Sequence, residues 1–146
     1  MTYAELKDKH RQEISVFPLA FAFNDKQFKD GMQKLGLKET DIHKVYKLGN
    51  TGGFYRISDS EKLHAMFKRH VYEMEDAIAA DLEGDGFIKD MFYTEMCDHE
   101  YCITRDSEVI LDALDLRAKD VANNAALRRG WVLAAELYNK SHTFSG

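Results

Sequence analysis

The sequence of 146 residues contains one proline, one tryptophan and two cysteines. Cys97 and Cys102 could close only a tiny loop, so the chain has no disulfide framework, and we expect both to be reduced thiols packed as small hydrophobic groups. No apolar run approaches the roughly 20 residues of a membrane-spanning helix. The N-terminal residues are charged and lack an apolar signal core. These absences predict a cytoplasmic protein that does not enter a membrane.

The composition is that of a folded chain. Hydrophobic residues make up 45% of the sequence and aromatic residues 12%, which excludes wholesale disorder. A chain of 146 residues can bury one core without metal or disulfide support. No internal repeat or low-complexity linker divides it. The sequence therefore predicts a single domain that spans residues 1–146.

The net charge of −5 is unevenly distributed. Residues 1–57 hold ten Lys and Arg against seven Asp and Glu, a balance of +3. Residues 71–115 hold fourteen Asp and Glu against only Lys89 and Arg105, a balance of −12. This region argues against a basic nucleic-acid footprint, so we expect no direct nucleic-acid binding. Its negative field favours a cationic partner, either a metal ion or a basic protein surface, although a solvated acidic face explains the same pattern.

Apolar spacing predicts a mainly helical chain. The expected helices cover residues 3–16, 25–35, 59–82, 87–99, 107–114 and 118–139. Capping spacings mark three of the starts: Thr2 with Glu5, Asn24 with Gln27, and Ser58 with Glu61. His10 lies among charged residues and is expected to be solvated. His70 lies within an apolar stripe, which is typical of a core histidine with a backbone partner.

Residues 41–58 change from the helical period to alternation. Two runs of β-forming residues surround the loop GNTGG, which predicts an antiparallel hairpin. The loop could also bind phosphate through its backbone, but it lacks the GxxxxGK[ST] pattern and no helix follows it directly. Residues 17–23 form a short apolar run, for which strand and buried coil are both open. The expected fold class is α+β, mainly α, with five or six helices and one small antiparallel β-hairpin.

Most of the chemically capable side chains lie within residues 84–104. If the helix that begins near Phe87 continues to His99, Glu95 and His99 lie one turn apart on the side that faces the core. Burying this pair is costly unless the carboxylate is paired, hydrogen-bonded or coordinated to a cation. The candidate binding residues are Glu95, Asp98, His99, Glu100 and Tyr101.

Three interpretations of this cluster are open. Glu95 and His99, with Asp98 or His70, could bind a divalent cation, although no HExxH motif, paired CxxC motif or diagnostically spaced third ligand is present. His99 could be a general base oriented by Glu95. Alternatively, Glu95 and His99 form a buried polar network that fixes how the helix end meets the hairpin. The DLEGDG run at residues 81–86 likewise lacks the full calcium-loop pattern.

Three stretches, FPLAFAFNDKQFKDGMQKLG, GNTGGFYR and DMFYTEMCDHEY, resemble a group of small proteins carried by phages and mobile elements of gut bacteria, Firmicutes especially. The resemblance covers most of the chain. Its MFxxELxNHEY pattern departs from this sequence at Met96 and Asp98, and Asp in place of Asn exchanges two hydrogen-bond donors for a charge. The family has no assigned activity, so the resemblance implies an origin in phages or mobile elements but no particular reaction. The positions that match the pattern are Met91, Phe92, Glu95, His99, Glu100 and Tyr101.

These observations lead to three hypotheses on function. The leading one is a non-enzymatic binding protein of a phage or mobile element that acts on a host protein with a basic surface. An acidic inhibitor of a nucleic-acid-binding defence enzyme is one concrete form, and it requires no cofactor. The alternatives are a metal-dependent hydrolase centred on Glu95, Asp98 and His99, which would need a divalent metal, and a homo-oligomeric structural protein.

Overall fold

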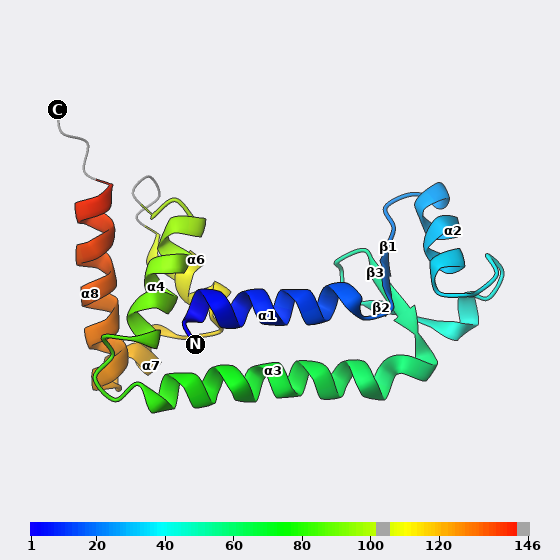
Figure 1. Cartoon of the computed structure of the whole chain (residues 1–146). Helices are drawn as coiled ribbons and strands as arrows, with labels where there is room; N and C mark the ends of the chain where they lie inside the picture. The colour runs from blue at the N-terminus through cyan, green and yellow to red at the C-terminus, as the bar shows by residue number, and fades with distance from the viewer. Residues whose placement is uncertain (102–105, 143–146) are drawn as a thin grey trace. The chain divides into compact units, whose positions relative to one another are not determined.

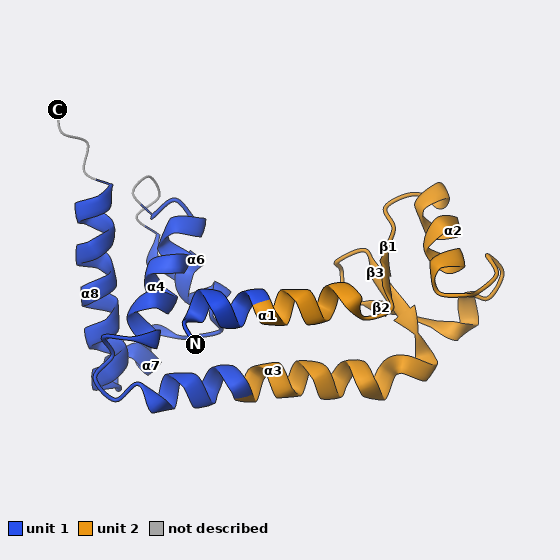
Figure 2. Ribbon diagram, viewed as in Figure 1, with its two compact units in different colours: residues 1–8, 73–146 blue, residues 9–72 orange. Residues whose placement is uncertain are grey.

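The computed structural model describes residues 1–101 and 106–142 (Figure 1). Over these residues it contains seven α-helices and a three-stranded antiparallel sheet, which confirms the predicted α+β, mainly α class. The chain divides into two compact units (Figure 2). Unit 1 comprises residues 1–8 and 73–146, and unit 2 comprises residues 9–72. The single domain expected over residues 1–146 stays a prediction beside this division.

Unit 2 is built on the small sheet. Its strands are β1 (Leu19–Phe21), β2 (Val45–Leu48) and β3 (Gly53–Arg56), in the order β1-β3-β2. The predicted hairpin is confirmed as β2 and β3, which 3-10 helices flank at Ile42–Lys44 and Ile57–Asp59. The run at residues 17–23 supplies β1, which pairs with β3 so that Ala20 lies opposite Phe54. The sheet therefore has one strand more than the expected hairpin.

Helix α2 (Asp25–Lys34) packs on one face of this sheet (Figure 1). It begins where predicted, because the Asn24 side chain accepts a hydrogen bond from the Gln27 N–H. Its contact with the sheet is close: a Cβ at Gly31 would overlap the Phe54 ring. The buried residues between helix and sheet are Ala20, Met32, Leu35 and Phe54.

Helices α1 (Tyr3–Val16) and α3 (Ser60–Ala80) contribute residues to both units. Within unit 2 the expectation that His10 is solvated is wrong, because its side chain is buried and its ring stacks on His70 with the centroids 3.9 Å apart. His70 is buried as predicted, but its Nε2 lies 2.6 Å from Oε2 of Glu13 and so has a side-chain partner. Helical spacing places His10 on the charged side of its helix. It does not reveal that the ring of His70, from another helix, packs against it.

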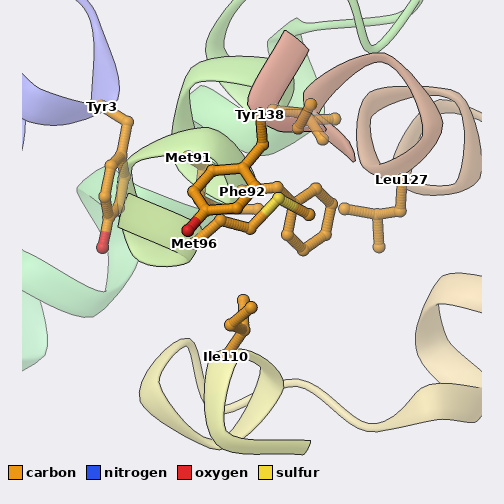
Figure 3. Close-up of a cluster of buried hydrophobic side chains, with 9 residues drawn as sticks. Tyr3, Met91, Phe92, Met96, Ile110, Leu127 and Tyr138 are labelled. Carbon is orange, nitrogen blue, oxygen red and sulfur yellow. The ribbon is translucent and has the colours of Figure 1, made fainter. Parts of the chain in front are cut away.

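Unit 1 contains α4 (Phe87–Asp98), α6 (Ser107–Ala113), α7 (Ala118–Ala122) and α8 (Ala125–Ser141). The expected single helix over residues 118–139 is therefore wrong. The chain leaves α7 at Asn123, and the side chain of Asn124 accepts from the Leu127 N–H, which starts α8 as a separate helix. Figure 3 shows the core between α4, α6 and α8, formed with Tyr3 by Met91, Phe92, Met96, Ile110, Leu127 and Tyr138.

The DLEGDG run at residues 81–86 forms the loop before α4, and Asp81 holds that loop together. The Asp81 carboxylate accepts hydrogen bonds from the backbone N–H groups of Gly84, Gly86 and Ile88, at 3.1, 3.2 and 2.9 Å. Gly84 has a φ of +76°, and a Cβ there would overlap the Ala126 carbonyl oxygen. Asp81 is thus engaged in closing the loop against α8. None of the helices in the described part has both the length and the apolarity to cross a membrane.

Candidate functional site

Glu95 is the buried ionisable residue of α4, with 2% of its surface exposed. It lies one helical turn beyond the buried Met91, so the side chain points from α4 toward the core as predicted. Its Oε1 accepts a hydrogen bond from the Tyr3 hydroxyl, and the Lys7 Nζ lies 2.7 Å from the same oxygen. Oε2 lies 3.2 Å from Nε2 of His99. The site is therefore assembled from the first two turns of α1 and the last two turns of α4.

The start of α1 positions the two partners. Tyr3 and Lys7 are one helical turn apart and so present the phenol and the ammonium on one side of the helix. The Thr2 hydroxyl oxygen accepts from the Glu5 N–H at 3.2 Å, which is one half of the predicted capping arrangement. The N–H of Ala4 donates to Oδ2 of Asp90 at 3.1 Å, which joins the first turn of α1 directly to α4.

Lys7 lies between two carboxylates. Its Nζ is 2.7 Å from Oε1 of Glu95 and 3.3 Å from Oδ2 of Asp98. An ammonium therefore takes the position that a cation bridging these two carboxylates would occupy. The arrangement compensates the buried charge of Glu95 within the protein.

The electrostatics keep Glu95 ionised and Tyr3 neutral. Burial alone would raise the pKa of Glu95, but the hydrogen bonds from Lys7 and Tyr3 outweigh it, and the pKa is lowered. Burial also works against the charge on Lys7, yet its hydrogen bond to Glu95 leaves the pKa of Lys7 raised. Burial, followed by the adjacent Glu95 carboxylate, raises the pKa of Tyr3 far above its ordinary value. At neutral pH the site thus holds a carboxylate, an ammonium and a phenol.

The remaining candidate residues have separate positions. Glu100 follows the end of α4 with a φ of +50° and an exposed side chain. Tyr101 is half-buried, and its ring packs edge-on against Trp131 and Tyr138 at centroid distances of 6.0 and 5.8 Å. His70 belongs to unit 2, where it contacts Glu13. The structure therefore brings Glu95, Asp98 and His99 together and assigns Tyr101 to the core of unit 1.

Cys97 adds no nucleophile to this cluster. Cys97 is an exposed free thiol, so the expectation that it packs as a small hydrophobic group is wrong. Partial desolvation together with the charge of Asp98 raises its pKa in spite of a hydrogen bond with Tyr93. A raised pKa keeps the thiol protonated at neutral pH, where the thiolate is the reactive form. Cys102 lies outside the described residues.

The structure bears on both the metal-site interpretation and the polar-network interpretation. Among the described residues, no group of three or more His, Cys, Asp and Glu side chains is arranged to hold a metal ion. The polar-network interpretation expected Glu95 and His99 to join the helix end to the hairpin, whereas the hydrogen bonds of Glu95 go to α1. Sequence reasoning missed Tyr3 and Lys7 because they lie 92 and 88 positions from Glu95 and carry no local signal.

A second feature of unit 1 is an acidic segment, which we define as residues 98–115. The sequence places a single Lys or Arg, Arg105, within it, and that residue lies outside the described part. Its acidic side chains are exposed at the end of α4 and along α6: Asp98, Glu100, Asp106, Glu108, Asp112 and Asp115. The segment therefore presents concentrated negative charge to solvent.

Comparison with known proteins gives a family for this chain. Residues 2–137 match the model of a family of unknown function, DUF7659. The chain belongs to the DUF7659 family. The match includes Tyr3 and Lys7 as well as Glu95, so both halves of the site are DUF7659 sequence. No curated protein and no solved structure matches the chain.

Proposed function

We propose that this DUF7659 protein is a non-enzymatic binding protein of a phage or mobile element, and that its acidic segment binds a basic surface on a host protein. The observation that carries the proposal is the exposure of six carboxylates within residues 98–115. Charges that face solvent attract a partner of opposite sign, which raises the association rate and selects against acidic surfaces.

Acidic residues between position 71 and the acidic segment add to the negative field of the segment. Of the fourteen acidic residues between positions 71 and 115, ten are exposed; the four beyond the segment are Glu75, Asp76, Glu83 and Asp85. A basic groove that normally holds nucleic-acid phosphates carries closely spaced Lys and Arg side chains. Inhibition of a nucleic-acid-binding defence enzyme is the concrete form of the proposal, because exposed carboxylates would pair with the same side chains as the phosphates.

The contacts around Glu95 indicate a structural role for the cluster and do not favour catalysis. Its carboxylate is engaged by Tyr3 and Lys7, which fix the start of α1 on α4. The metal-dependent hydrolase alternative would need Glu95 and Asp98 to exchange the Lys7 ammonium for a metal ion. We therefore assign the cluster a scaffold role and place the interaction on the exposed carboxylates.

Affinity capture from a bacterial host lysate tests the proposal when two charge-matched variants are compared. The segment variant carries Glu108→Gln, Asp112→Asn and Asp115→Asn, and the control variant carries Asp30→Asn, Glu39→Gln and Glu136→Gln, all outside residues 71–115. All six positions are exposed, so each triple variant loses three negative charges and should remain folded. We expect the wild type and the control to retain a basic nucleic-acid-binding protein, and the segment variant to bind it about tenfold more weakly or worse.

The captured protein then allows two decisive measurements. Its dissociation constant should rise steeply between 50 and 300 mM salt, since exposed charges are screened over about 8–10 Å at such ionic strengths. The DUF7659 protein should also displace nucleic acid from it. Equal loss of binding in both triple variants, or binding that does not respond to salt, would overturn the proposal.

A further inference from the structure

Unit 2 contains a cavity of about 380 Å³ that the scaffold role and the acidic segment do not use. It lies where α2 faces the β2–β3 hairpin and the GNTGG loop. Its volume is within the range of small-molecule sites, which is about 300–1,000 Å³. The lining residues that matter here are Phe28, Ile42, Val45, Lys47, Asn50 and Phe54.

The floor of the cavity is apolar and partly aromatic. The rings of Phe28 and Phe54 lie with their centroids 5.2 Å apart at an interplanar angle of 39°. Val45 packs against the same buried cluster, and Ile42 stands at the rim with 65% of its surface exposed. Surfaces of this kind favour apolar groups, aromatic rings included, because such groups gain dispersion and hydrophobic energy on leaving water.

The hairpin loop closes one end of the cavity with backbone. Gly49 and Gly52 have φ values of +54° and +79°, which L side chains rarely adopt, so glycine is required for this loop shape. Both glycines line the cavity beside Asn50 and contribute no side-chain bulk themselves. The GNTGG loop is therefore both the turn of the predicted hairpin and one wall of a concave site.

Lys47 is the one charged side chain in the lining. It lies opposite Phe54 in the β2–β3 register, so its stem starts beside the aromatic floor. Within the described residues no hydrogen bond or ion pair engages its exposed ammonium. A single cation above an apolar floor matches a ligand with one negative charge, whereas a phosphate dianion would call for further basic groups.

We propose that this cavity binds a small aromatic molecule that bears a single carboxylate. The ring system lies on Phe28 and Phe54, and the carboxylate pairs with the Lys47 ammonium. The proposal is independent of the function assigned to the acidic segment, because every lining residue belongs to unit 2.

Titration of the ¹⁵N-labelled protein with 2-naphthoate, followed by amide chemical shifts, tests this site. We expect saturable shifts at Gly49, Asn50 and Phe54. The neutral isostere 2-naphthalenemethanol should shift the same amides with about fivefold weaker affinity, as expected for loss of one exposed ion pair. Lys47→Met should weaken naphthoate binding by about fivefold and leave the alcohol unchanged, while the exposed control Lys26→Met changes neither.

A variant that fills the cavity separates this site from general apolar binding. Ala22→Phe places a ring in the lining and should abolish the shifts caused by both ligands. If that variant does not fold, the two lysine variants still decide the question. The proposal is overturned if naphthoate causes no saturable shifts in the lining, if the alcohol binds as tightly as the acid, or if Lys47→Met and Lys26→Met behave alike.

Discussion

The Nζ of Lys7 lies 2.7 Å from Oε1 of Glu95, across 88 positions of sequence. The Glu95 side chain is 3% exposed and the Lys7 side chain 34%, so the pair is a buried carboxylate held by a partly solvated ammonium. Removal of one partner from a buried pair leaves the other charge uncompensated. The Lys7 ammonium thus fixes the first turns of α1 on α4.

Loss of this ammonium should destabilise the protein. We expect Lys7→Met to lower the free energy of unfolding by about 2 kcal/mol, less than for a fully buried pair because Lys7 is partly exposed. Urea denaturation measures the change, with the exposed Lys119→Met as the control. A loss no larger than that of the control would show that the ion pair contributes nothing to folding.

The Tyr3 hydroxyl should contribute separately from its ring. Tyr3→Phe retains the edge-on contact with Phe87, at a centroid distance of 5.9 Å, and removes the hydrogen bond to Glu95. Since a hydrogen bond to a charged group contributes about 1.5–3 kcal/mol, we expect a loss of about 1.5 kcal/mol in the same denaturation experiment. Tyr46→Phe, at an exposed position, should cost almost nothing; equal losses at the two tyrosines would contradict the assigned role.

Stability should fall in acid. The pKa of Glu95 is lowered in the folded protein, and the hydrogen bonds of Arg69 and His70 lower that of Glu13 to about 2. Folded-state values below the unfolded ones give stability that is present above the unfolded pKa of about 4.3 and is lost as the pH falls below it. Unfolding free energies at pH 7, 5, 4 and 3 should show this decline, and Glu95→Gln should make it shallower. If the decline of stability with falling pH is unchanged in Glu95→Gln, Glu95 does not contribute to the sensitivity to acid.

Stability should also fall in strong alkali. The pKa values of Tyr3 and Lys7 are both raised in the folded state. Groups with raised values give stability that is complete below the unfolded pKa, here about 10, and is lost as the pH rises above it. Thermal unfolding between pH 8 and 11 should show the loss, and the double variant Tyr3→Phe/Lys7→Met should lose less over this range. A parallel decline in both proteins would assign the effect to other groups.

Gly130 provides a test of the packing between α4 and α8. Helix propensity alone predicts that Gly130→Ala stabilises α8 by about 1 kcal/mol. A Cβ at this position would overlap the Ile88 side chain, which is fully buried, so we expect a net loss of about 1–3 kcal/mol. Combining Gly130→Ala with Ile88→Ala, which removes the Cγ2 that the new Cβ would meet, should cost less than the sum of the two single losses. Stabilisation by Gly130→Ala alone would show that this contact is loose.

Local chemistry accounts for the elements that the sequence predicted. The helix over residues 3–16 has the predicted bounds, and α2 starts after Asn24, whose amide oxygen satisfies a backbone N–H of the first turn. The break between α7 and α8 escaped prediction because apolar residues keep the helical period across Asn124. Strand β1 could not be assigned from three residues, since its partner β3 lies more than 30 positions away.

Only part of the site could be predicted from the sequence, because local spacing does not reveal contacts between distant segments. The inward direction of Glu95, and its proximity to His99, follow from helical spacing and agree with the structure. The hydrogen bonds from Tyr3 and Lys7 depend on how two distant helices pack, and no local pattern encodes that. His10 shows the same limit, because its burial against His70 comes from the opposite helix.

A double-mutant cycle between Lys7→Met and Glu95→Gln tests the scaffold role most directly. The variants are compared singly and together by urea denaturation at pH 7. If Lys7 compensates the buried charge of Glu95, the combined loss should be smaller than the sum of the single losses by about 1.5 kcal/mol. Losses that add within about 0.3 kcal/mol would mean that the two groups do not interact and would contradict the scaffold role of the pair.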